Sequence, residues 1–241
     1  MKTVTILDTE TTGLSPTEDK CIEVAVVHYS LEHASVIKSF AGLIAIEGEN
    51  EAERVNHIPT GLLHDSGSQA ECAWQAAATV AQGSEAVLAH NSDFDHAWVP
   101  EGSALLDLPW IDTLALDWPM QSKPGSALIT LALEHGLGVV DPHRALSDCM
   151  LLARMLTRCH ELGHDLNALL APGCDRARYS KRWCPTMTGS LRRWRGSSGR
   201  ATVSDGCGRC QRKTRRNFRS ERESLRVDIG VRSGYIRSRT I

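Results

Sequence analysis

Asp8 and Glu10 are the first residues of the chain whose spacing suggests chemistry. They are two positions apart at the end of a short β-branched run, so a strand would point both carboxylates to the same face. Two converging carboxylates repel each other unless a cation lies between them. The pair predicts a cation site, although a triplet of this kind also occurs as two solvated acids in a turn.

Further candidates follow along the chain: Asp95, His143 and Asp148. Asp95 lies in the first turn of a predicted helix, where it is either a third ligand or a complement to the helix dipole. Asp148 lies in the first turn of the longest predicted helix, and His143 precedes it in a loop. A histidine is a suitable general base near neutral pH. A surface histidine and a helix-capping acid are the alternatives for these two residues.

These four carboxylates and one histidine suit a two-metal phosphodiester hydrolase. Mg²⁺ and Mn²⁺ prefer oxygen ligands. Two such ions, about 3.5–4 Å apart, can activate a water and stabilise the leaving oxygen of an in-line displacement. His143 would then remove a proton from that water.

The strands and helices predicted around these residues indicate an α/β fold, with a mixed sheet flanked by helices. Apolar runs predict strands over residues 4–7, 22–29, 35–46, 86–90 and 110–111, with a turn at 31–33. Helices are predicted over 69–82, 93–99, 114–118, 126–135 and 146–162, and 47–68 has the composition of a loop. Gly136 suits the position after a helix end. Ligands of such sheets gather at the carboxyl ends of strands.

With these motifs in place, the chain resembles the DEDDh (DnaQ-like) 3′–5′ exonucleases, the family of the bacterial DNA polymerase III proofreading (epsilon) subunit. Asp8-x-Glu10, Asn91-x-x-Phe94-Asp95 and His143-x4-Asp148 match its three motifs in order and spacing. The segment from His143 to Cys149 is most similar to exodeoxyribonuclease X. The resemblance covers residues 3–170. It implies an RNase H-like fold, a pair of Mg²⁺ or Mn²⁺ ions held by Asp8, Glu10, Asp95 and Asp148, and His143 as the base.

The resemblance also implies substrate-binding residues: Thr11, Gly13, Leu14, His57 and Asn91. Thr11, Gly13 and Leu14 match the segment that meets the 3′-terminal nucleotide, with Leu14 as a wedge against the terminal base. His57 lies in a loop that departs from the family pattern, because Asn56 precedes it and the usual glycine after the histidine is absent. An ordinary loop histidine is the alternative. Asn91 would orient Asp8 or contact the nucleotide, and Asp112 is either part of a family helix start or only an N-cap.

The implied reaction is the release of nucleoside 5′-monophosphates from single-stranded or frayed DNA 3′ ends, in repair or proofreading. An RNA exonuclease is the closest alternative, because the catalytic motifs do not separate DNA from RNA. The other alternative is a non-catalytic protein on a nuclease fold that contacts a DNA polymerase or repair complex.

Charge divides the chain into two parts. Residues 1–171 contain 8 basic and 24 acidic residues, whereas residues 172–241 contain 19 basic and 5 acidic residues. We interpret 1–171 as the exonuclease domain and 172–241 as an Arg-rich tail of low order. The tail either supplies phosphate contacts or is a frameshifted remnant, since an out-of-frame translation of GC-rich DNA would have a similar composition. A zinc site at Cys207 and Cys210 is a further hypothesis.

The sequence contains no apolar stretch long enough for a membrane span, and its first residues lack a secretory signal. We therefore expect a cytoplasmic protein.

Overall fold

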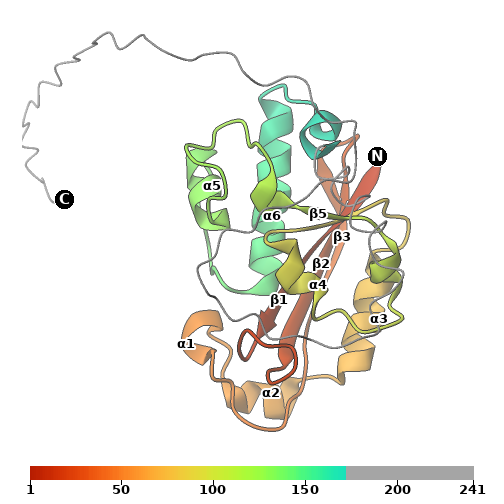
Figure 1. Cartoon of the computed structure of the whole chain (residues 1–241), viewed down its shortest axis with the longest axis vertical. Helices are drawn as coiled ribbons and strands as arrows, with labels where there is room; N and C mark the ends of the chain where they lie inside the picture. Colours follow the sequence, from red (N-terminus) through yellow and green to blue (C-terminus); the bar gives the residue numbers. More distant parts are fainter. Residues whose placement is uncertain (172–241) are drawn as a thin grey trace, which may run out of the picture. The chain divides into compact units, whose positions relative to one another are not determined.

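The computed structural model describes residues 1–171, which form a five-stranded sheet with helices on both faces (Figure 1). The strands are β1 (Thr3–Thr11), β2 (Cys21–Ser30), β3 (Ser35–Leu43), β4 (Val87–Ala89) and β5 (Trp110–Asp112), in the spatial order β3-β2-β1-β4-β5. The first three strands are antiparallel, whereas β4 and β5 continue the sheet in parallel with β1. The predicted mixed sheet is confirmed.

The α-helices are α1 (Glu53–Asn56), α2 (Thr60–Ser66), α3 (Ala70–Val80), α4 (Ser92–His96), α5 (Leu128–Glu134) and α6 (Ala145–Glu161). Short 3₁₀ turns cover Ala104–Asp107 and Thr113–Ala115. Gly136, with φ of 73°, follows the end of α5 as predicted.

Helices α6 and α3 cover opposite faces of the central strands (Figure 1). Alternation along β1 decides which side chain meets which helix. Val4 and Ile6 are buried in the core that contains the apolar residues of α6, whereas Leu7 belongs to the core beneath α3. Asp8 and Glu10 continue the even-numbered series, so β1 presents them on the α6 side.

Two predictions of secondary structure were wrong. Residues 47–68 are not a plain loop, since they contain α1 and α2. Both helices are too short to be stable alone. Tertiary contacts stabilise this segment. Ile58, which lies between the two helices, and Leu63 of α2 are buried against Ile22 of β2. The helix predicted over 114–118 is only a 3₁₀ turn, since the buried Trp118 donates its indole N–H to the Thr113 carbonyl at 2.8 Å.

The predictions about residues 172–241 lie outside the described residues. They comprise the low order of the tail, its phosphate contacts, the zinc site at Cys207 and Cys210, and the frameshift. Within residues 1–171, no helix is both long and apolar enough to cross a membrane.

Candidate active site

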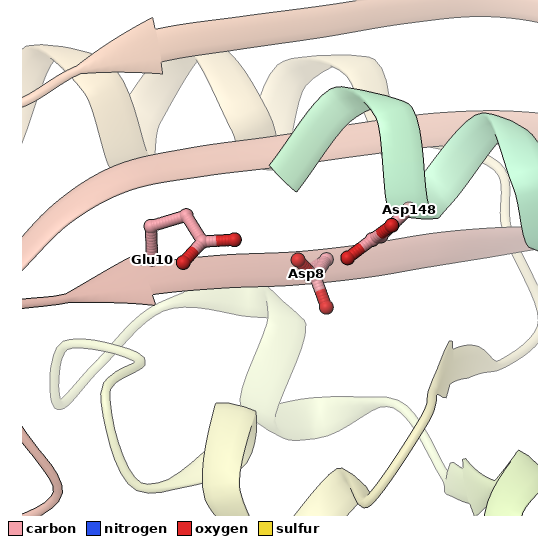
Figure 2. Close-up of side chains that lie close together, drawn as sticks. All are labelled: Asp8, Glu10 and Asp148. Atoms are coloured by element: carbon pink, nitrogen blue, oxygen red, sulfur yellow. The ribbon is translucent and has the colours of Figure 1, made fainter. Parts of the chain in front are cut away.

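Asp8, Glu10 and Asp148 form an acidic cluster at the carboxyl-terminal half of β1 (Figure 2). One carboxylate oxygen of each residue lies within 4.8 Å of one oxygen of the other two. Asp8 and Glu10 come from the α6-facing side of β1, and Asp148 comes from the first turn of α6. The side chains point toward one another in Figure 2, although 138 residues of chain separate Glu10 from Asp148.

Burial raises the pKa values of all three carboxyl groups, and repulsion from neighbouring acids raises those of Asp8 and Glu10 further. Desolvation is the largest cause in each case. The pKa of Asp8 is raised well above its usual value, with additional repulsion from Asp95, Asp148 and Glu10. The pKa of Glu10 is raised to about 8. Carboxylates concentrated in this way favour a compensating cation, and an oxygen-only donor set suits Mg²⁺ or Mn²⁺. The residues therefore fit the predicted divalent metal site.

Asp95 lies beside this cluster but has a different partner. It lies in α4 and is 2% exposed, and one carboxylate oxygen accepts a hydrogen bond from the Thr9 hydroxyl at 2.8 Å. Burial raises the pKa of Asp95 to about 7, against the opposing effect of the bonds with Thr9. Among the charged neighbours, Asp95 contributes most to the raised pKa of Asp8. Asp95 thus adds to the negative potential of the site while its carboxylate is held by Thr9.

His143 is exposed in the loop that leads into α6, and its backbone is left-handed with φ of 63°. Its backbone N–H donates to Asp148 Oδ2 at 3.3 Å. This bond and the charge of His143 both lower the pKa of Asp148, against the larger effect of burial. The structure therefore brings His143 and Asp148 together through the backbone.

The sequence interpretation missed Glu23 and Arg144. Glu23 is a buried acid in β2, directly opposite Glu10 in the strand register. The Arg144 guanidinium donates to both Glu23 carboxylate oxygens, at 3.1 and 2.9 Å. The available signal was a single acid within the mostly apolar run of 22–29, but its partner is 121 residues away in sequence.

The predicted substrate-binding residues at the end of β1 and just after it have different surroundings. The Thr11 hydroxyl donates to the Gly13 carbonyl at 2.6 Å, and the Thr11 carbonyl accepts from the Asn56 side chain at 3.2 Å. A side chain at Gly13 would clash with the Asp19 carboxylate. Leu14 is 83% exposed, the largest exposed fraction among the exposed large hydrophobic residues of the described chain. Leu14 is therefore free to meet a ligand.

His57 and Asn91 both adopt left-handed backbone conformations, with φ of 57° and 78°. His57 thus occupies a conformation that glycine adopts without strain. It lines a cavity of about 700 Å³ together with Glu23 and Arg144. Asn91 donates its backbone N–H to Asp112 at 3.0 Å, and Asp112 also caps the turn at Thr113–Ala115. Of the two alternatives for Asp112, the structure shows the N-cap, at the start of a 3₁₀ turn.

The chain is similar in sequence to known proteins. Residues 5–156 match the model of the RNase_T exonuclease family. The chain is 28% identical over 167 residues to a PolC-type DNA polymerase III of Thermotoga petrophila, covering 66% of this chain but only 12% of that polymerase. It is 28% identical over 183 residues to the DNA polymerase III epsilon subunit of Treponema pallidum, covering 70% of this chain and 83% of the subunit.

A solved structure has the same fold. Exonuclease X in complex with 5′-overhanging duplex DNA superposes with a TM-score of 0.52 at 24% identity, covering 70% of this chain and 98% of that one. This likeness is one of fold, and it agrees with the RNase H-like arrangement predicted from the motifs.

Proposed function

Because the chain belongs to the DEDDh 3′–5′ exonuclease family, we propose that it hydrolyses the terminal phosphodiester bonds of single-stranded or frayed DNA and releases nucleoside 5′-monophosphates. The observation that carries this proposal is the convergence of Asp8, Glu10 and Asp148 within 4.8 Å. The pKa values of these three carboxyl groups are raised by burial, and such a group of acids favours a compensating cation.

In the proposed site, Asp8, Glu10 and Asp148 hold divalent cations, with Asp95 as the fourth acid. Two bound Mg²⁺ or Mn²⁺ ions would supply Lewis acidity that lowers the pKa of water and offsets charge on the phosphate. His143 accepts the proton of the attacking water, because it is exposed and adjoins Asp148 through its backbone. Leu14 packs against the terminal base. This role is supported by the exposure of Leu14 just beyond the end of β1.

Thr11, Gly13, His57 and Asn91 complete the proposed substrate-binding set. A side chain at Gly13 would displace the Asp19 carboxylate, which accepts the Ser15 backbone N–H, so Gly13 supports the turn after β1. His57 lines the same cavity as Glu23 and Arg144, so it could contact a nucleic-acid strand that enters this cavity.

DNA is the proposed substrate because the chain is similar to DNA polymerase III subunits. The matching polymerases are far longer than this chain, so a role in proofreading or repair, and a polymerase or repair-complex partner, belong to the proposal. We also propose that residues 1–171 are the catalytic domain and that the basic residues of 172–241 add salt-dependent phosphate contacts.

The decisive experiment compares matched DNA and RNA oligonucleotides, labelled at the 5′ end, with Mg²⁺, with Mn²⁺ and with EDTA. We expect stepwise shortening of single-stranded DNA from the 3′ end, with nucleoside 5′-monophosphates as products and no activity in EDTA. Faster degradation of RNA would favour the RNA exonuclease. Activity that survives EDTA would refute the metal site, and absence of activity on both nucleic acids would favour a non-catalytic interaction protein.

A further inference from the structure

Glu23 is a buried acid beside the proposed site, and its carboxylate accepts three hydrogen bonds. It is 3% exposed and lies on β2 opposite Glu10. Its Oε2 atom accepts from Arg144 Nε at 3.1 Å and from the Ala145 backbone N–H at 3.0 Å. Its Oε1 atom accepts from an Arg144 Nη at 2.9 Å. Such a paired, charge-assisted geometry is among the strongest side-chain interactions.

These bonds supply the cap that α6 lacks. The first backbone N–H groups of a helix have no partner within the helix. Arg144 is the N-cap residue of α6, and its own side chain makes no cap hydrogen bond. Glu23 accepts the N–H of Ala145, the first and fully buried residue of the helix. The start of α6 is therefore fixed by an acid that belongs to the sheet.

The same short segment carries two of the proposed functional residues. His143 precedes Arg144, and the Asp148 backbone N–H donates to the Arg144 carbonyl at 3.1 Å. The Asp148 carboxylate in turn accepts the His143 backbone N–H. Arg144 thus connects Glu23 with both residues, and a shift of the Arg144 backbone would move His143 and Asp148 together.

We infer that Glu23 and Arg144 are a positioning pair, which clamps the first turn of α6 to β2 so that Asp148 and His143 stay beside Asp8 and Glu10. This inference rests on the proposed function of those four residues. Glu23 acts through Arg144 and Ala145, since these donors occupy both of its carboxylate oxygens. In the part of the chain that the structure describes, the acidic cluster consists of Asp8, Glu10 and Asp148 without Glu23.

The test compares the full-length wild-type protein with Glu23→Gln, Glu23→Ala and Arg144→Lys. Glu23→Gln retains one acceptor oxygen, whereas Glu23→Ala removes both and risks unfolding. Arg144→Lys keeps the charge but loses the planar fork. The matched control is Thr157→Val on the same helix, which removes the hydrogen bonds of Thr157 with Tyr29 and with the Ala34 carbonyl, far from Asp148 along α6. The readouts are kcat and KM on a DNA oligonucleotide, Mn²⁺ affinity by calorimetry, and thermal unfolding.

We expect Glu23→Gln to lower both kcat and Mn²⁺ affinity by about 10-fold, because losing a partner that orients a metal ligand typically costs about 10–100-fold. Glu23→Ala should lower them further and Arg144→Lys less, with KM within about twofold of wild type. Thr157→Val should lower the unfolding temperature and leave kcat and Mn²⁺ affinity unchanged. A merely structural pair would resemble this control.

The outcomes separate this inference from the proposed function. Folded Glu23→Gln and Arg144→Lys proteins with wild-type kcat and Mn²⁺ affinity would overturn the positioning pair and leave the exonuclease in place. A wild-type protein that binds Mn²⁺ but cleaves no nucleic acid would refute the function, and the change in Mn²⁺ affinity would still decide the pair. A wild-type protein that does neither would overturn both.

Discussion

Val4 and Ile6 share one face of β1 with Asp8 and Glu10, and α6 covers both halves of that face. The first half buries aliphatic side chains against the apolar residues of α6. The second half carries partly buried carboxyl groups whose pKa values are raised by desolvation and repulsion. Aliphatic burial stabilises the fold, whereas unpaired buried acids destabilise it. The contrast indicates that the acidic half is maintained for a ligand rather than for folding.

The largest effect on this contrast is expected when one acid is removed. Asp8→Asn should abolish hydrolysis, because the metal site loses a central ligand and metal Lewis acidity is worth several kcal/mol. The unfolding temperature in EDTA should equal or exceed that of wild type, because an amide removes a buried charge surrounded by other acids. Oligonucleotide turnover and thermal unfolding check the two parts. Full activity in this variant would refute the site.

The second prediction separates acid–base chemistry from metal binding. His143→Asn should lower kcat by about 10²–10⁴-fold, the usual contribution of a general base. Asparagine is chosen because it tolerates the left-handed backbone at this position. Mn²⁺ affinity should stay close to wild type, because the His143 backbone N–H that contacts Asp148 is retained.

A loss of Mn²⁺ affinity as large as the loss of kcat would show that His143 acts through the metal site instead. Asp148→Asn is the matched comparison, since it should lose both properties together.

These two predictions use residues that the sequence revealed, and the reason is local geometry. Alternation along a strand puts Asp8 and Glu10 on one side whatever the rest of the fold does. The helix that carries Asp148 is long and periodic, so it was predictable over residues 146–162 and is observed over Ala145–Glu161. The resemblance to the DEDDh family then implied that these segments meet in one site.

The features that the sequence did not reveal depend on distant contacts. Glu23 finds Arg144 across 121 residues, and Asp95 finds Thr9 across 86. Helix α1 is held partly by Asn56, whose side chain bonds with Asn50 and with the Thr11 carbonyl. Short helices have little intrinsic stability, so composition alone predicted a loop. No local sequence pattern predicts such distant partners.

The third prediction tests the aliphatic half of β1. Ile6→Ala should lower the free energy of unfolding by about 2–5 kcal/mol, because Ile6 is 1% exposed and its removal leaves a cavity. The kcat per folded molecule should stay near wild type. Urea denaturation and turnover at low temperature measure these effects. Ile37→Ala on β3 is the control, since Ile37 is 54% exposed and its loss should cost less than about 0.5 kcal/mol.

An Ile6→Ala protein that is as stable as the control would mean that this half of β1 does not support the fold. A selective loss of kcat without loss of stability would mean that the two halves of the face share one role.

The smallest expected effect is a pH dependence of stability in the metal-free protein. The folded-state pKa of Glu10 is raised from 4.5 to about 8, and that of Asp95 from 3.8 to about 7. Between the ordinary and the raised values the folded protein binds more protons than the unfolded chain. Its free energy of unfolding must therefore fall as pH rises through this window. Histidines with lowered pKa values, His28 and His90, have the opposite effect at lower pH, so the measurement starts at pH 6.5.

In EDTA, the unfolding temperature should fall between pH 6.5 and pH 8.5 by several degrees, since 1 kcal/mol corresponds to about 2–4 °C in a domain of this size. Added Mg²⁺ should raise it more at pH 8.5 than at pH 6.5, because a cation favours the ionised carboxylates. Glu10→Gln should flatten the metal-free slope, because the group that titrates near pH 8 is removed. A metal-free unfolding temperature that stays level or rises over this range would mean that burial and repulsion do not raise the pKa values of these acids. The acidic half of β1 would then be no more costly to the fold than the aliphatic half.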